Sequence, residues 1–274
     1  MSRIVTVQDI SCVGQCSITV ALPIVSAFGV ETSILPSAVL STHTGGFKGF
    51  TFRDLTDDMP KIYRHWHAEK LDFDAIYTGY LGNAKQVDYI LEMTSLVLKK
   101  NGLLIVDPAM ADYGKLYTGF DDAFVREMAR LCSHADYILP NLSEAAFILK
   151  EKYVAEGYDR AYIEKLCKGL HALGAKNVVL TGVGFNADQL GVAIYDGKDI
   201  EYYFNKREKR NSHGTGDIFA SVFTGALMTG HTAYEAAALA ADFTVKAIQA
   251  TADDPTHTYG VKFEKVIPFI TENL

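Results

Sequence analysis

Short apolar runs of strand length alternate with longer amphipathic runs of helix length along most of the chain. The strand-length runs are 3–8, 32–35, 74–78, 103–106, 136–139 and 177–181. The helix-length runs lie around 16–28, 54–69, 84–100, 121–133, 143–150 and 159–173. Several strand-length runs are apolar on both faces, as is typical of parallel strands covered on both sides. This order predicts right-handed βαβ units and an α/β fold in three layers, with a mostly parallel central sheet between helices.

The alternation breaks at 190–204, where Asp196 and Gly197 separate two β-rich runs and predict a hairpin. Three helical patterns follow, at 215–229, 233–250 and 262–272. Because the chain contains no internal repeat or low-complexity linker, we predict one domain over residues 1–274. The segment 37–52 is rich in Gly, Thr and Ser, and it predicts a short strand followed by a loop that covers a site.

Charge and composition exclude several classes of protein. The 274 residues carry a net charge of -7, which argues against a nucleic-acid-binding surface. No apolar stretch approaches the roughly 20 residues that a membrane-spanning helix requires, and residues 3–8 predict a first strand rather than a signal peptide. The four cysteines are few for this length and fit a reducing compartment, so we expect a cytoplasmic protein that binds neither nucleic acid nor membrane.

Polar residues follow five of the predicted strands at the point where each strand ends. They are Gln8 and Asp9, Gly79 and Tyr80, Asp107 and Pro108, Pro140 and Asn141, and Thr181 and Gly182. In an open parallel sheet these junctions lie along one edge, at the carboxyl ends of the strands, where ligands bind. A helix cap explains any single one of them. Five in register predict the wall of a pocket.

The segment "HGTGDIFASVFTGAL" places a Gly-rich turn at the start of a long apolar helix. Gly214, Thr215 and Gly216 would expose backbone N–H groups that, together with the helix dipole, attract an anion. Asp217 in the first turn compensates a helix dipole in the simpler interpretation. One capping serine would suffice for that role, so we favour phosphoryl transfer, in which the carboxylate accepts a proton from the attacking hydroxyl. The pattern matches neither a Walker A motif nor a dinucleotide fingerprint.

These motifs resemble those of the ribokinase-like (carbohydrate kinase) superfamily. "HGTGD" resembles its G-x-G-D signature, "VDPAMAD" at 106–112 resembles D-P-V-M-G-D, and "PNLSEA" at 140–145 resembles P-N-x-x-E-A. "STHTGG" at 41–46 and "YTGYLG" at 77–82 resemble the pyridoxal kinase branch in particular. The resemblance covers nearly the whole chain, and the motifs occur in the expected order.

The resemblance implies three groups of functional residues. The catalytic group is Asp217 as the base, with an anion hole of Gly214, Thr215 and Gly216. The group that organises ATP and Mg²⁺ is Asp107, Asp112, Asn141, Glu144 and Thr181, with Asp107 and Glu144 as metal ligands. The substrate group facing the pyridine ring is His43, Thr44 and Tyr80. A monovalent cation is left open as a further requirement.

Two positions depart from the branch. Asp9 stands where pyridoxal kinases usually have Ser, and Ala111 replaces the Gly of D-P-V-M-G-D. In one interpretation the carboxylate of Asp9 pairs with a cationic group of the substrate, which adds Asp9 to the substrate group. In the other, Asp9 only caps the following turn. The basic run 205–210 predicts a solvated loop, with attraction of ATP as the alternative.

The leading hypothesis is therefore an ATP- and Mg²⁺-dependent kinase for the 5'-hydroxymethyl group of a B6 vitamer in pyridoxal 5'-phosphate salvage. A hydroxymethylpyrimidine kinase of thiamine synthesis is the alternative enzyme. A vitamer- or nucleotide-binding regulator without turnover is the alternative from another class, against which the retained Asp217 and its flanking glycines argue. We also predict a homodimer, because the 37–52 region is expected to be poorly covered by one chain and the family commonly forms two-fold dimers.

Overall fold

The computed structural model describes residues 1–208 and 212–273, which form one large sheet and a small hairpin. The sheet has nine strands in the order β11-β10-β9-β8-β5-β4-β1-β2-β3. Their bounds are β1 Arg3–Ser11, β2 Glu31–Leu40, β3 Phe52–Asp54, β4 Phe73–Thr78, β5 Leu98–Val106, β8 Tyr137–Ile138, β9 Asn177–Val183, β10 Gln189–Tyr195 and β11 Ile200–Lys206. The six strands from β9 to β2 are parallel, whereas β3, β10 and β11 run antiparallel to their neighbours.

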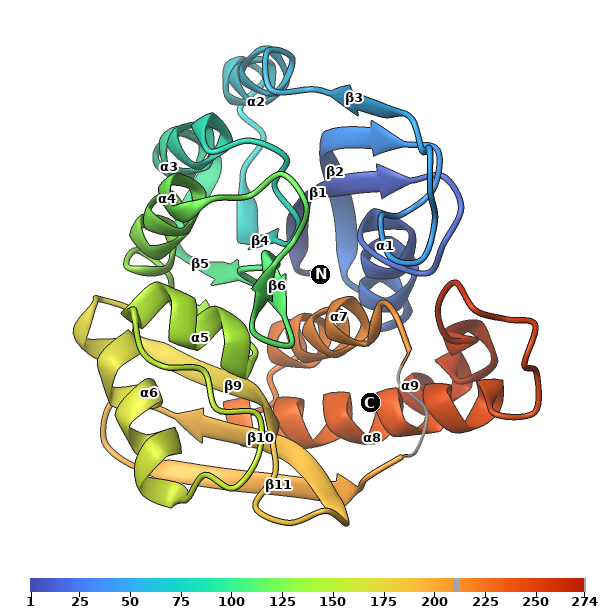
Figure 1. Cartoon of the computed structure of the whole chain (residues 1–274). Coiled ribbons are helices and arrows are strands. Elements are labelled where there is room, and N and C mark those ends of the chain that lie inside the picture. The colour runs from blue at the N-terminus through green and yellow to red at the C-terminus, as the bar shows by residue number, and fades with distance from the viewer. Residues whose placement is uncertain (209–211, 274) are drawn as a thin grey trace.

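Helices cover both faces of this sheet (Figure 1). One layer holds α2 Met59–Ala68, α3 Lys85–Val97, α4 Asp122–Cys132, α5 Leu142–Leu149 and α6 Arg160–Ala172. The other holds α1 Ile18–Ala27, α7 Thr215–Met228, α8 Ala233–Thr251 and α9 Ile267–Thr271. A separate apolar core lies between the sheet and each layer. The predicted three-layer α/β fold is thus confirmed, while one domain over residues 1–274 stays a prediction.

Three elements differ from the sequence-based expectation. The short strand β3 follows the 37–52 loop, and β6 Ala111–Asp112 pairs with β7 Lys115–Leu116 in a small hairpin. Both were missed because strands of two or three residues are too short for a periodic pattern. The segment 262–272 is not one helix: a 3-10 turn, η1 Phe263–Lys265, precedes α9, which has Pro268 in its first turn.

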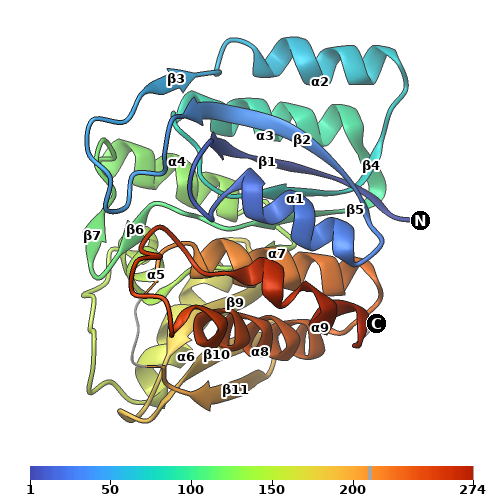
Figure 2. The same ribbon diagram turned by 90° about the vertical axis from the view of Figure 1, so that its right-hand side faces the viewer.

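The parallel strands place their carboxyl ends at one edge of the molecule. In Figure 2 this edge lies at the left, where the chain from β2 to β3, the β6–β7 hairpin and the start of α7 come close together. The chain ends lie at the opposite edge. Among the described residues, no helix is both long enough and apolar enough to span a membrane.

Candidate active site

The first turn of α7 is open at the carboxyl edge of the sheet. Gly214 precedes it with a left-handed backbone (φ 75°), and no side chain of the described residues caps the helix. A Cβ atom at Gly214 would lie 1.9 Å from the carbonyl oxygen of Gln15, whereas one at Gly216 would meet no atom within 4 Å. Gly214 therefore packs against the β1–α1 loop, and Gly216 borders free space beside uncapped N–H groups, which is the setting that an anion requires.

Asp217 lies in this first turn and is half-buried. Burial and the nearby charge of Asp9 raise its pKa, a hydrogen bond from the backbone N–H of Ser17 lowers it, and together these effects bring the pKa to about 7. Ser17 has a positive φ of 52°, a conformation that non-glycine residues rarely adopt and that often marks a functional site. A carboxylate with a pKa near neutrality is suited to accept and release protons at physiological pH.

Asp9 is buried at the end of β1, with only 3% of its surface exposed. Burial raises its pKa, while hydrogen bonds from the hydroxyls of Ser17 and Ser11 lower it. The Ser11 hydroxyl donates to Asp9 Oδ2 over 2.8 Å. Tyr80 lies close enough to Asp9 to be affected by its charge: burial raises the pKa of Tyr80 to about 12, and the charge of Asp9 contributes to this shift. The predicted neighbours Asp9, Tyr80 and Asp217 are thus brought together.

A second pair of acids, Asp107 and Glu144, adjoins Asp217. Burial raises the pKa of Asp107 well above its usual range, and the charges of Glu144 and Asp217 add to the shift. Burial also raises the pKa of Glu144 to about 8, against hydrogen bonds from three backbone N–H groups. Glu144 Oε2 accepts from Asn141 N–H at 2.8 Å and Oε1 accepts from Met110 N–H at 3.1 Å. Because burial and mutual repulsion disfavour the ionised forms of both groups, a bound cation would stabilise the two carboxylates.

A divalent cation fits this pair on chemical grounds. The described residues contain no cluster of three or more His, Cys, Asp or Glu with metal-binding geometry. Mg²⁺ does not need one, because it is commonly held by one or two carboxylates together with water and substrate phosphates. Asp107 is the more available carboxylate, since both oxygens of Glu144 already accept backbone hydrogen bonds.

Asn141 lies at the same edge and also has a structural role. Its side-chain oxygen caps α5 by accepting from Ser143 and Glu144, and its amide donates to the Ala111 carbonyl at 2.8 Å. With Glu144 it forms a capping box, so both residues join the 107–112 loop to α5. Thr181 adjoins Asn141 through a parallel bridge. Asp112 is exposed as a residue, but partial burial of its carboxyl group raises its pKa, against smaller lowering effects of the Tyr113 N–H and of His213.

The predicted substrate loop carries His43 and Thr44. Thr44 is exposed, whereas His43 is buried and both of its ring nitrogens contact the backbone. The Gly45 N–H donates to His43 Nδ1 at 3.1 Å, and Nε2 lies 3.0 Å from the Tyr259 carbonyl oxygen. These contacts occupy both ring nitrogens of His43.

Sequence reasoning missed Ser11 and Ser17, which contact Asp9, and His213, which immediately precedes Gly214 and lies beside His43. Their position beside motif residues is the only signal in the sequence that could have found them. Within the basic run 205–210, residues 209 and 210 lie outside the described residues, and the predicted attraction of ATP stays a prediction.

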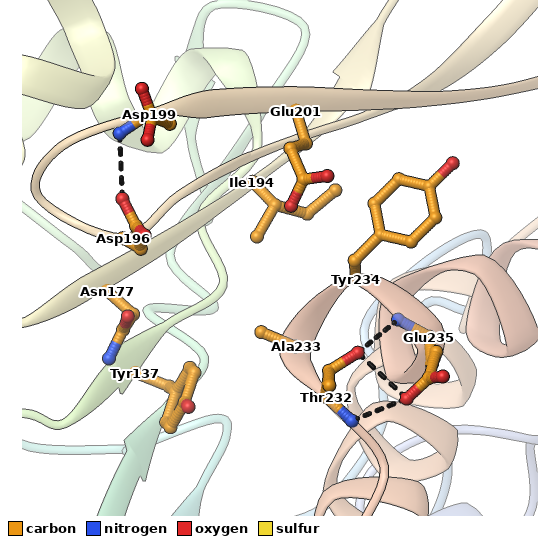
Figure 3. Close-up of a pocket in the computed structure, with 10 residues that line it drawn as sticks. All are labelled: Tyr137, Asn177, Ile194, Asp196, Asp199, Glu201, Thr232, Ala233, Tyr234 and Glu235. Carbon is orange, nitrogen blue, oxygen red and sulfur yellow. Dashed lines mark hydrogen bonds between the residues drawn. The ribbon is translucent and has the colours of Figure 1, made fainter.

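A cavity of about 470 Å³ lies away from this site, at the amino ends of β8 and β9. Figure 3 shows its acidic side chains, of which Asp196 and Glu235 already accept hydrogen bonds within the protein. Asp196 accepts backbone N–H groups of its own turn, and Glu235 forms a capping box with Thr232. We therefore place the candidate site at the carboxyl edge.

Comparisons with known proteins agree with this fold. A family model described as phosphomethylpyrimidine kinase matches residues 25–261. The structure of a "putative phosphomethylpyrimidine kinase" from Bacteroides thetaiotaomicron VPI-5482 is 36% identical, covers 98% of this chain and 94% of that one, and gives a TM-score of 0.94. A second crystal form, described as containing pyridoxal, gives 0.93.

Two further relatives carry different substrate names. The pyridoxal kinase of Lactobacillus plantarum is 32% identical over 100% of this chain and 98% of its own, with a TM-score of 0.91. The hydroxymethylpyrimidine/phosphomethylpyrimidine kinase of Haemophilus influenzae is 29% identical over 68% of this chain and 70% of its own. Since the family model spans most of the chain and these structures share its ribokinase-like fold, the chain is a kinase of the phosphomethylpyrimidine kinase family.

Proposed function

We propose that this kinase transfers the γ-phosphoryl group of ATP to the 5'-hydroxymethyl group of a B6 vitamer: pyridoxal, pyridoxamine or pyridoxine. The observation that carries the proposal is the open, uncapped start of α7 with Asp217 in its first turn. This turn combines an anion-binding surface with a base whose pKa is about 7. Phosphoryl transfer from ATP to a hydroxyl needs both.

In this proposal Asp217 accepts the proton of the attacking hydroxyl as the new O–P bond forms. The N–H groups of Gly214, Thr215 and Gly216 donate to the oxygens of the transferred phosphoryl group, where negative charge accumulates. The N–H of Ser17 holds the Asp217 carboxylate in place. Gly216 carries no side chain because the phosphoryl group must approach the backbone closely.

The nucleotide phosphates are proposed to lie between α7 and the acids Asp107, Asp112 and Glu144, near Asn141 and Thr181. Asp107 and Glu144 would hold Mg²⁺, which neutralises charge on the phosphate oxygens when bound. The buried, mutually repelling carboxylates of Asp107 and Glu144 support this part of the proposal.

The vitamer is proposed to lie between Asp9, Tyr80 and the loop that carries His43 and Thr44. The Tyr80 ring lies beside that of Phe120, with centroids 5.4 Å apart and planes tilted by 33°, and would supply an aromatic wall for a flat ring. Asp9 is a buried carboxylate whose described partners are two hydroxyls and its own backbone N–H, all uncharged, so a cationic group of the substrate would neutralise it. The pyridoxal in the name of the Bacteroides structure supports a pyridine ring as ligand.

A hydroxymethylpyrimidine kinase is the second candidate, because the matching family model and the Haemophilus influenzae relative carry that name. Purified protein should be assayed with ATP and Mg²⁺ against pyridoxal, pyridoxamine, pyridoxine and hydroxymethylpyrimidine. We expect the highest kcat/KM with one of the three B6 vitamers. A higher value for hydroxymethylpyrimidine would replace the first candidate by the second, and no turnover of any of the four would contradict both.

A further inference from the structure

We propose that His213 is a positioning residue that fixes the substrate loop, residues 41–46, against the anion turn, residues 212–216. The inference rests on the proposed function in one respect, since it takes the substrate loop as the vitamer side of the site. It assigns no proton transfer to His213. His213 instead makes a packing contact between the two segments. Their spacing sets the distance between the vitamer hydroxyl and the phosphoryl group that it attacks.

The substrate loop is anchored on one side by His43. A Cβ atom at Gly14 would lie 2.0 Å from Cδ2 of His43, so this ring lies directly on the backbone of the β1–α1 loop. The Tyr259 carbonyl and the Gly45 N–H occupy the two ring nitrogens. The N–H of His43 also donates to the Val13 carbonyl at 3.2 Å. These contacts bind the loop to neighbouring loops but not to the anion turn.

His213 supplies the missing contact. A Cβ atom at Gly45 would lie 2.7 Å from Nδ1 and 2.9 Å from Cε1 of His213, so the imidazole lies on the Gly45 backbone. The His213 and His43 rings are tilted neighbours with centroids 5.5 Å apart. These contacts form a ladder in which the His43 ring covers Gly14 and the His213 ring covers Gly45.

The last member of the ladder adjoins the catalytic machinery directly. His213 precedes Gly214, whose left-handed backbone begins the turn that carries Asp217. Gly214 is itself packed on the Gln15 carbonyl and has no freedom to follow the loop. The position of the substrate loop relative to the anion turn therefore depends on the ring at position 213, and loss of that ring should weaken vitamer binding more than ATP binding.

Amide hydrogen exchange tests the contact without any assumption about the substrate. His213→Ala should speed exchange of residues 41–46 by about tenfold or more, because local opening then needs one packing contact fewer. His213→Phe keeps a flat ring and should retain protection close to that of the wild type. His65→Ala, on the exposed face of α2, is the matched control and should leave the loop unchanged. The proposal would be overturned if His213→Ala left the exchange rates of residues 41–46 unchanged, or if His213→Phe lost as much protection there as His213→Ala.

Gly45→Ala gives an independent test from the other side of the contact. Gly45 does not have the left-handed backbone, so alanine is conformationally allowed there, but its methyl group would displace the His213 ring. Gly45→Ala should therefore reproduce the effect of His213→Ala, and the double variant should be no worse than either single variant. If the losses of exchange protection in the two single variants added up in the double variant, Gly45 and His213 would have unrelated roles, which would contradict the ladder.

Steady-state kinetics then links the contact to the site. His213→Ala should raise the KM for the vitamer about tenfold with little change in the KM for ATP, because only the substrate loop is released. An equal rise for both substrates would contradict the assigned role. If the wild-type protein phosphorylates no vitamer, the proposed function fails, and the exchange measurements still decide whether the ladder holds.

Discussion

At the scale of single residues, the carboxylate of Asp217 depends on two neighbours with opposite effects. Asp9 raises its pKa by charge repulsion, and the N–H of Ser17 lowers it by donating a hydrogen bond. Burial is the largest cause, and the three effects together bring the pKa to about 7. A base of this strength is ionised for part of the time at neutral pH and still able to hold a proton.

This pKa predicts a pH dependence. Below about 7 the folded protein holds Asp217 protonated and unable to accept the hydroxyl proton, so kcat/KM should rise with pH and level off above 7. Asp9→Asn removes the repelling charge and should move the rising limb to lower pH. Initial rates between pH 5.5 and 8.5 would test this. A flat profile, or a shift to higher pH in Asp9→Asn, would contradict the assignment.

Asp9 also predicts a change of substrate preference. If its carboxylate pairs with the cationic aminomethyl group of pyridoxamine, Asp9→Ser should lower kcat/KM for pyridoxamine relative to pyridoxal. Loss of a charge-assisted hydrogen bond would account for about a tenfold change in that ratio. Competition assays with both vitamers measure it directly. Equal losses for the two vitamers would instead give Asp9 a structural role.

Residue-level prediction from the sequence worked where a motif fixes local geometry. The positions of Asp9, Asp107, Glu144 and Asp217 at one edge follow from strand ends and from the helix start. The double use of Glu144, as a cap and as part of the acidic pair, could not be predicted. Nor could Ser17, because its contact with Asp217 joins segments 200 residues apart in the sequence.

At the scale of elements, the long strands and helices were predictable because their burial patterns repeat over many residues. β1, β4 and β9 and the β10–β11 hairpin lie where the apolar runs place them. β5 begins at Leu98, inside the predicted helix 84–100, because Leu98 pairs with Phe73 of β4. Pairing with a neighbouring strand sets this boundary, and the local pattern of apolar residues carries no information about that pairing.

The turn before α7 predicts different outcomes for its two glycines. Gly214→Ala places a methyl group 1.9 Å from a backbone oxygen and at positive φ, so it should destabilise the fold by about 1–3 kcal/mol. Gly216→Val extends into open space, so it should leave the Tm nearly unchanged while it blocks the anion. Thermal melts and ATP titrations separate the two. A stable Gly214→Ala variant, or a Gly216→Val variant with normal ATP affinity, would contradict this geometry.

At the scale of the whole molecule, the far edge of the sheet predicts a homodimer. All three residues of β3 are exposed, and Phe52 keeps 43% of its surface accessible on this edge strand. An exposed edge strand that carries a large apolar side chain such as Phe52 can be covered by a second chain. Sedimentation should show a dimer at micromolar concentration and a monomer for Phe52→Asp. A wild-type protein that is only monomeric would contradict the prediction.

The whole fold also accounts for the placement of the acids. Six parallel strands direct their carboxyl ends to one edge, and the two core clusters hold the helix layers that carry Glu144 and Asp217 on opposite faces. The phosphoryl group is proposed to pass between these layers. In this account the proton transfer depends on the carboxylate of Asp217 alone, while ATP is bound by other groups: the backbone N–H groups of the turn before α7 and the acids that would hold Mg²⁺.

The most direct test is therefore the activity of Asp217→Asn with pyridoxal, measured beside its affinity for ATP. Asn is nearly isosteric and tolerated at a helix start, so the protein should fold and bind ATP as the wild type does. Without the proton acceptor, kcat should fall by about 10²–10⁴-fold. An Asp217→Asn protein that phosphorylates pyridoxal at a rate near that of the wild type would contradict the account and leave Asp217 as a helix-dipole partner.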